Sequence, residues 1–191
     1  MTGFFGESPA SLGDFARYKI PVFFVNSLND EECTSVILSL GIDLLLNVGT
    51  PRKLSKMFLQ NVGCDVLNVH PGVLPKYRGA SCVEWEIFTD GPIGNTAHFM
   101  VEDYNAGPII ALEDYRFQIG SSYSDIRTKI YTKSTRLMVE SVGLILRNGL
   151  NSRNIEEQNI LIDPYPPMSP EDMLIVLEKI KNSSHHAICL N

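Results

Sequence analysis

The chain has 191 residues, of which 44% are hydrophobic and 20% charged, an ordinary composition for a globular domain with a substantial core. Its net charge is −6 and its Lys and Arg residues are scattered, which argues against a nucleic-acid partner, because phosphate binding needs clustered cations. No apolar run approaches the ~20 residues of a membrane span, and residues 1–10 lack the features of a signal peptide, so we expect a cytoplasmic protein without a membrane partner.

The hydrophobic pattern predicts helices and strands that alternate along the chain. The predicted elements are a helix at 8–18 with Ser8 or Ser11 as N-cap, a strand at 21–25, a helix from 29 or 30 to 40, a strand at 42–48, a helix at 53–60, a strand at 65–69, a helix at 81–89, strands at 95–102 and 109–115, and a long amphipathic helix at 124–146. Gly41 stands where a helix end favours positive φ. The run at 42–48 is apolar almost throughout, which is typical of a buried parallel strand.

The last part of the chain is expected to differ from this pattern. A proline-rich linker at 163–170 leads to a helix that Ser169 caps. The tail from Lys181, which includes His185 and His186, is polar and is expected to fray. We therefore expect a core at 1–160, followed at 161–191 by a linker, a helix and a tail.

The alternation of strands and helices predicts an α/β fold with a mainly parallel sheet flanked by helices. Ligands of such sheets bind outside the carboxyl ends of the strands. Three loops lie at such strand ends, at 49–54, 68–79 and 103–108.

The first chemical signal is the sequence NVHPG at 68–72, directly after a predicted strand. Asn68 and His70 are two residues apart on an extended segment, so their side chains project to the same side. An amide and an imidazole there can bind a carbonyl oxygen and support negative charge on it, and a histidine can transfer a proton near neutral pH. Alone, the pair is a weak sign of catalysis, because most Asn-x-His pairs only form turns.

Two further motifs strengthen this signal: LPKYRG at 74–79 and DYNAGPI at 103–109. With them, residues 20–150 resemble the formyltetrahydrofolate-dependent formyltransferases, which include the glycinamide ribonucleotide, methionyl-tRNA and sugar N-formyltransferases. The family pattern is Asn-x-His-Pro, then Leu-Pro-x-x-x-Gly, then Asp-x-Gly-(Pro or Asp)-Ile. The resemblance implies a Rossmann-like formyltransferase fold and the transfer of a formyl group from 10-formyltetrahydrofolate to a primary amine.

The resemblance also implies roles for single residues. Asn68 would hydrogen-bond the formyl oxygen, His70 would stabilise the oxyanion and shuttle protons, and an aspartate of the third motif would orient the histidine and accept a proton. This chain has Asn105 at the aspartate position, and a neutral amide cannot accept a proton. Because loss of a positioned base costs ~10²–10⁴-fold in rate, we expect folate binding with impaired chemistry. Three readings stay open: a weak or inactive relative, Asp103 acting in place of the missing aspartate if the loop shifts, or an aspartate that was replaced deliberately or by drift.

By the same resemblance, three segments would surround the folate. The expected cofactor-binding residues are Arg52, Lys53 and Leu54 in the pterin loop, Leu74 beside the cofactor, and Val101, Glu102 and Asp103 in the opposite wall. Core packing is an equal alternative for Leu54 and Val101. No metal site is expected, because the four cysteines lack the spacing of metal ligands.

The sequence departs from the family pattern near the N-terminus. Family members begin with a strand, a Gly-rich turn, a helix and a second strand, whereas residues 1–14 contain no such first strand–helix–strand unit. Its absence puts a phosphorylated acceptor in doubt, and an open sheet edge favours a homodimer.

Three functions remain in competition. The leading one is formyl transfer to a small amine acceptor, for which an amino sugar is suggested by a weak similarity at 165–168. The alternatives are a formyltetrahydrofolate hydrolase and a catalytically silent folate- or nucleotide-binding protein. Of the other polar residues, His98 is expected to be structural, and Glu84 and Glu86 are expected to be solvated.

Overall fold

The computed structural model describes residues 12–49, 53–149 and 156–190, and its main sheet holds four strands in the order β1-β2-β3-β4. These strands are β1 Leu44–Asn47, β2 Asp65–His70, β3 Gly94–Phe99 and β4 Ile109–Asp114. β1 and β2 are parallel, whereas β2 pairs antiparallel with β3, and β3 antiparallel with β4. The sheet is therefore mixed, which corrects the expectation that it is mainly parallel. Only the loop at 100–108 joins β3 to β4, and it is too short for the crossover that parallel strands need.

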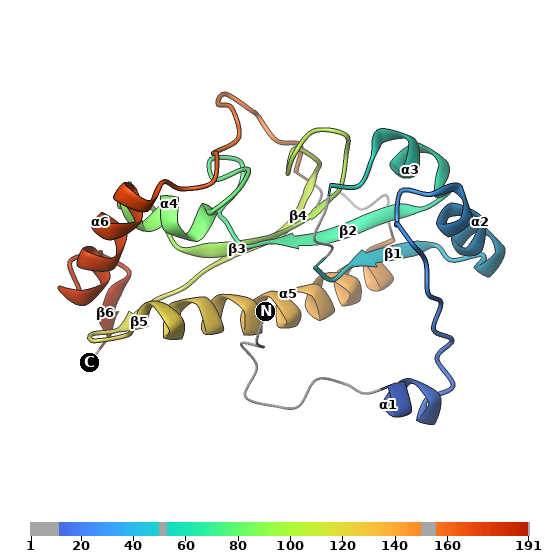
Figure 1. The fold of residues 1–191 in the computed structure, drawn as a ribbon, viewed down its shortest axis with the longest axis horizontal. Helices are drawn as coiled ribbons and strands as arrows, with labels where there is room; N and C mark the ends of the chain where they lie inside the picture. The colour runs from blue at the N-terminus through green and yellow to red at the C-terminus, as the bar shows by residue number, and fades with distance from the viewer. Residues whose placement is uncertain (1–11, 50–52, 150–155, 191) are drawn as a thin grey trace.

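Helices flank this sheet, so the predicted α/β class is confirmed (Figure 1). α5, Tyr123–Asn148, runs along one face of the sheet, while α4 and α6 lie together at one end and α2 and α3 at the other. The remaining elements are α1 Leu12–Arg17, α2 Glu31–Leu40, α3 Lys56–Asn61, α4 Cys82–Phe88, α6 Pro170–Lys181, and a small sheet of β5 Phe117–Gln118 and β6 Ile188–Leu190. None of the helices in the described part of the chain is both long and apolar enough to cross a membrane.

The long helix α5 contributes to two of the three clusters of buried apolar residues. Its first turns bury Ile126 and Ile130 against α4 and α6, and its later turns bury Leu137 and Ile145 against β2 and β3. The third cluster, around Phe58, packs α2 and α3 against β2. α5 begins with a capping box in which the Ser122 and Asp125 side chains each accept a hydrogen bond from the other residue's backbone N–H.

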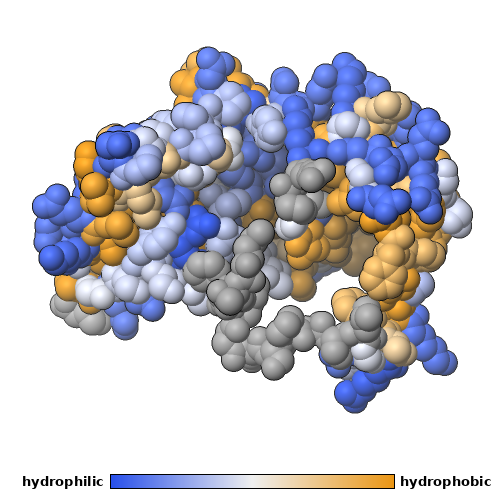
Figure 2. All heavy atoms as spheres, viewed as in Figure 1, coloured by the Kyte–Doolittle hydropathy of each residue, from blue (hydrophilic) through white to orange (hydrophobic). Residues whose placement is uncertain are grey.

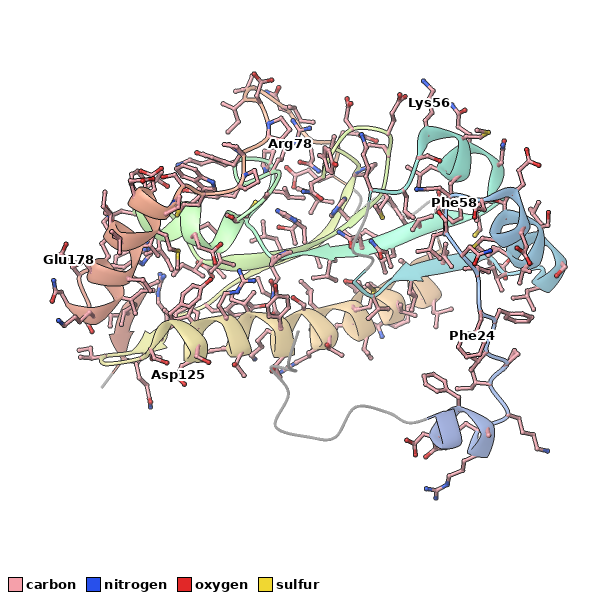
Figure 3. The ribbon with its side chains drawn as sticks, in the orientation of Figure 1. Phe24, Lys56, Phe58, Arg78, Asp125 and Glu178 are labelled. Atoms are coloured by element: carbon pink, nitrogen blue, oxygen red, sulfur yellow. The ribbon has the colours of Figure 1, made fainter. Side chains whose placement is uncertain are left out.

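The predicted strand at 21–25 is wrong. This segment is irregular and exposed, with Phe24 83% accessible to solvent (Figures 2 and 3). Within the described residues β1 pairs only with β2, so the segment has no neighbouring strand that would bond its backbone. The predicted helix at 8–18 is present as α1, and its N-cap candidates Ser8 and Ser11 lie outside the described residues.

The expectation of a frayed polar tail is also wrong. The side chains of His185, Ala187 and Ile188 are buried, and β6 pairs with β5. The Phe117 backbone N–H donates to the carbonyl oxygen of Ala187 at 2.7 Å. The tail is ordered because its few apolar residues complete the cluster between α4, α5 and α6.

The loop at 100–108 depends on a glycine at one position. A Cβ on Gly107 would lie 2.0 Å from the carbonyl oxygen of Phe99, where β3 and the loop meet. We expect Gly107→Ala to lower the free energy of unfolding by about 2–4 kcal/mol, because backbone must move to admit the methyl group. Gly143→Ala in α5 is the matched control: there the nearest atom belongs to the flexible Arg147 side chain, so alanine should be neutral or stabilise by up to ~1 kcal/mol. Urea denaturation of both variants tests this, and equal effects would contradict it.

Candidate functional site

A cavity of about 300 Å³ lies where β1 and β2 end, facing the loop at 100–108. Among the residues predicted for the site, those that line it are Lys53, Leu54, Asn68, His70, Val101, Asp103 and Asn105. Two other predicted residues, Leu74 and Glu102, are not part of the lining. Leu74 is buried in the core, Glu102 forms an exposed ion pair with Lys56 (labelled in Figure 3) at 2.6 Å, and Arg52 lies outside the described residues.

A row of three polar side chains crosses the sheet at the floor of this cavity. The strand register places Asn47 opposite Asn68, and Asn68 opposite His98. The Asn47 amide donates to Asn68 Oδ1 at 3.0 Å, and Asn68 Nδ2 lies 3.1 Å from His98 Nε2. His98 Nδ1 lies 2.8 Å from the carbonyl oxygen of Phe99. This network assigns the His98 proton to Nδ1, so that Nε2 accepts from Asn68.

This row leaves one amide hydrogen of Asn68 for a ligand, because Oδ1 and the other amide hydrogen are engaged within the protein. His98 is buried and hydrogen-bonded, which confirms its structural role, but it also lines the cavity. Sequence reasoning missed Asn47 and this second role of His98. The sequence shows only that Asn47 and His98 lie on predicted strands. It does not show how these strands pair with the strand of Asn68, and it is this pairing that aligns the three side chains.

His70 is fixed by the loop that follows it. Its Nε2 donates to the carbonyl oxygen of Tyr77 at 2.7 Å. A Cβ on Gly72 would lie 2.7 Å from both atoms of this hydrogen bond, so only glycine fits there. The bond leaves Nδ1 of a neutral imidazole as a proton acceptor. Burial lowers the pKa of His70 to about 4, so the ring is neutral at physiological pH.

The loop that carries Asn105 is held by its backbone from two sides. The buried Arg78 (labelled in Figure 3) donates from Nε to the carbonyl oxygen of Tyr104 at 2.8 Å. The Gln158 amide donates to the carbonyl oxygens of Asn105, at 3.0 Å, and of Gly107. Asn105 has a φ of 49°, a conformation that asparagine tolerates better than most residues, and it lines the cavity together with His98.

The segment at 156–168, called here the strap, joins these loops. Its backbone pairs with Ile109 at one end and with Gly79 further along. Between these points Arg78 donates to the carbonyl oxygen of Ile162 at 3.3 Å. Tyr165 stacks on Tyr77 and on Trp85, with ring centroids 5.8 and 5.1 Å apart. The strap therefore positions the loops of the second and third sequence motifs relative to each other.

The expectation that Glu84 and Glu86 are solvated is wrong. Their relative exposures are 4% and 0%, because α4 is enclosed by the loop after β2, by α5 and by α6. Glu86 accepts from the backbone N–H groups of Val73 and Gly94 at 2.6 and 3.3 Å, which anchors the loop after His70. Burial raises the pKa of Glu86 to about 9.

The electrostatics of the cavity suit a polar, uncharged group. Burial lowers the pKa of His98 to about 4, as it does for His70, so both imidazoles are neutral at pH 7. Asn105 carries no charge. The charged side chains of the lining are Lys53, whose Nζ lies 4.5 Å from the centre of the Tyr104 ring, and Asp103. Among the described residues, no group of three His, Cys, Asp or Glu side chains is arranged to hold a metal ion. The site can therefore bind a carbonyl oxygen through Asn68 and accept a proton on His70.

The lowered pKa values of His70 and His98 can be tested by titration. We expect the rings of His70 and His98 to titrate near pH 4 rather than near 6.5 when followed by NMR. In the unfolded chain both rings take up a proton near pH 6.5, so folding stability should fall as the pH drops from about 6.5 to about 4 and be unaffected by these groups above that window.

The raised pKa of Glu86 changes the free energy of unfolding in the opposite sense, so that it falls as the pH rises. A variant that lacks one of the two histidines therefore isolates the contribution of that histidine. The free energy of unfolding of His98→Gln should depend less steeply on pH between 5 and 6 than that of the unmodified chain. An unchanged slope would mean that His98 protonates freely in the folded protein.

Comparisons with known proteins agree on one family. Residues 10–142 match the family described as formyl transferase. A methionyl-tRNA formyltransferase of Thermotoga sp. (strain RQ2) is 25% identical over 173 residues, which cover 87% of this chain and 54% of that protein. The chain thus spans about half the length of this relative.

Two solved structures have the same fold. The phosphoribosylglycinamide formyltransferase of Campylobacter jejuni has a TM-score of 0.58 at 23% identity, covering 71% of this chain and 73% of its own. The formyltransferase PseJ of Anoxybacillus kamchatkensis, in complex with UDP-4,6-dideoxy-4-formamido-L-AltNAc and tetrahydrofolate, has a TM-score of 0.52 at 17% identity, covering 74% and 71%.

Proposed function

The chain belongs to the formyl transferase family, and we propose that it transfers the formyl group of 10-formyltetrahydrofolate to a primary amine of a small acceptor. An amino sugar is our first candidate for the acceptor. The observation that carries this proposal is the meeting of Asn68, His70 and Asn105 on one cavity, although they come from two segments far apart in the sequence.

The lining of the cavity suits the reactive end of a folate. Leu54 and Val101 offer apolar surface, and the loop at 53–55 is fixed because the Asn29 side chain bonds the backbone of Lys53 and Ser55 at 3.0 and 2.7 Å. The volume of about 300 Å³ is at the lower end for small-molecule sites, so the cavity would enclose part of the donor rather than all of it. Lys53, Leu54, Val101 and Asp103 would hold that part.

The residues of the chain then have distinct tasks. When bound, 10-formyltetrahydrofolate supplies an activated formyl group. Asn68 donates its remaining amide N–H to the formyl oxygen, where negative charge develops as the amine adds. His70 is neutral, and its Nδ1 would take up a proton from the attacking amine and pass it to the nitrogen of tetrahydrofolate that departs when its bond to the formyl carbon breaks. Asn105 holds the position of a carboxylate without the charge that would stabilise an imidazolium, so we propose that turnover is slow.

Restoring the carboxylate tests this reading. We expect Asn105→Asp to raise the rate of tetrahydrofolate release from 10-formyltetrahydrofolate, in the presence of amino sugars, by roughly 10²–10⁴-fold, because it adds a positioned base. The added charge should also raise the pKa of His98. Asn61→Asp, the same change on the exposed end of α3, is the matched control and should leave the rate unchanged.

Calorimetric binding of a stable analogue of 10-formyltetrahydrofolate should give similar affinities for the unmodified chain and for Asn105→Asp. If neither protein binds the analogue, the proposed function is contradicted.

A catalytically silent folate-binding protein is the second candidate, and Asn105, whose amide cannot accept a proton, favours it. Asp103 separates the two candidates, because it is the carboxylate that remains in the lining. If Asp103 acts as the base, Asp103→Asn should abolish the measured turnover while the analogue still binds, more weakly, through Lys53, Leu54 and Val101. A silent binding protein shows no turnover before or after this change, and Asn105→Asp leaves it silent.

A further inference from the structure

The hydrogen bonds of the row formed by Asn47, Asn68 and His98 all run in one direction across the sheet. Asn47 donates to Asn68, and Asn68 donates to Nε2 of His98. His98 in turn donates from Nδ1 to the carbonyl oxygen of Phe99. A single reversed group would bring two donors or two acceptors together, so each member depends on the orientation of the others. The direction of the row therefore decides which end of the Asn68 amide faces His98.

Groups that can only accept hydrogen bonds stand at both ends of this row. At one end, the carbonyl oxygen of Phe99 lies 2.8 Å from His98 Nδ1 and keeps the proton there. At the other end, Asn47 Nδ2 lies 3.0 Å from Asn68 Oδ1 and 3.4 Å from Sδ of Met100, a weak acceptor. Both contacts favour the amide nitrogen of Asn47 over its oxygen at this place. Because Phe99 and Met100 are consecutive, one short segment at the end of β3 fixes both ends of the row.

The Asn68 amide has two orientations of nearly the same shape, related by a half-turn that exchanges its nitrogen and its oxygen. In the observed orientation, the N–H that is left for a ligand lies on the side of His98. In the reversed orientation an oxygen would take that place, and it would repel a carbonyl oxygen of the ligand. Of the two neighbours that hold this amide, His98 is 1% exposed, whereas Asn47 is half-buried in the lining of the cavity. Asn47 can therefore be replaced with little disturbance of the core.

We propose that Asn47 is a positioning residue, whose amide holds the Asn68 amide in the orientation that presents an N–H, and not an oxygen, to the formyl oxygen of the donor. This inference rests on the proposed function and deepens it, because it adds a residue that acts through Asn68. Asn47 belongs to none of the three sequence motifs of the site.

Two variants of Asn47 test this role. Asn47→Asp places a group that only accepts beside Asn68 Oδ1, and at a half-buried position this carboxylate is ionised at pH 7. It should turn the Asn68 amide around. Asn47→Leu removes the donor without adding an acceptor, so His98 should still hold the amide in its observed orientation. Asn61→Asp, on the exposed end of α3, is the matched control for the added charge.

The first readout is calorimetric binding of a stable analogue of 10-formyltetrahydrofolate and of the same analogue without its formyl group. The ratio of the two affinities isolates the contact to the formyl oxygen, because a general effect of the new charge acts on both ligands. Asn47→Asp should lower this ratio by about tenfold or more, since a hydrogen bond is replaced by a contact between two oxygens. Asn47→Leu should lower it less, and Asn61→Asp should leave it unchanged.

The second readout needs no ligand. In the unmodified chain, NMR should detect a scalar coupling across the hydrogen bond between the nitrogens Asn68 Nδ2 and His98 Nε2. The coupling should persist in Asn47→Leu and disappear in Asn47→Asp, because an oxygen then faces His98. The same spectra show whether each variant is folded. Absence of the coupling from the unmodified chain, or its persistence in folded Asn47→Asp, would overturn the proposed role of Asn47.

The two readouts separate this inference from the proposed function. If the unmodified chain binds neither ligand, the proposed function is contradicted, while the coupling still decides whether Asn47 orients Asn68. If the formyl analogue binds and Asn47→Asp weakens both ligands equally, Asn47 has only a structural role and the proposed function stands.

Discussion

The strand register that aligns Asn47, Asn68 and His98 is the constraint on which the site depends. These side chains come from three strands, one parallel pair and one antiparallel pair, and they meet only because each faces its neighbour directly. A slip of one residue in either pairing would turn the slipped strand's side chains to the opposite face of the sheet and break the hydrogen-bonded row. The buried clusters on β2 and β3 fix this register, because the same slip would remove Leu67 or Ala97 from the apolar cluster that packs against α5.

Around this row, hydrogen bonds that fix the neighbouring loops are more prominent than charged side chains. Glu86 anchors the loop after β2, Arg78 and Gln158 hold the loop after β3, and the strap connects both. These groups are buried or partly buried, so their hydrogen bonds are little weakened by competition with water. Low exposure also keeps the imidazoles of His70 and His98 neutral, so these two rings, like Asn68, contribute hydrogen-bond donors and acceptors to the cavity without a charge.

Much of the fold could be predicted from the sequence, because local patterns specify elements. The span of α5, the cap at Ser169 and the positive φ of Gly41 all follow from periodicity and from residue preferences, and the structure has each of them. Properties that depend on tertiary pairing could not be predicted. The direction of β3, the absence of a strand at 21–25 and the burial of Glu84 are decided by which elements pack together, and no single segment contains that information.

The same division holds at the site, where motifs identified Asn68 and His70 but gave no sign of Gln158 or of the strap. The way in which Arg78 and Gln158 hold the loop affects how this site can change during evolution. Arg78 and Gln158 recognise main-chain oxygens, which an aspartate supplies as well as an asparagine does, so these contacts to the loop do not depend on the amide of Asn105. A carboxylate and an amide can exchange there without moving their neighbours. The side chain that the loop presents to the cavity at position 105 can thus be altered by a single codon change while the contacts that hold the loop stay as they are.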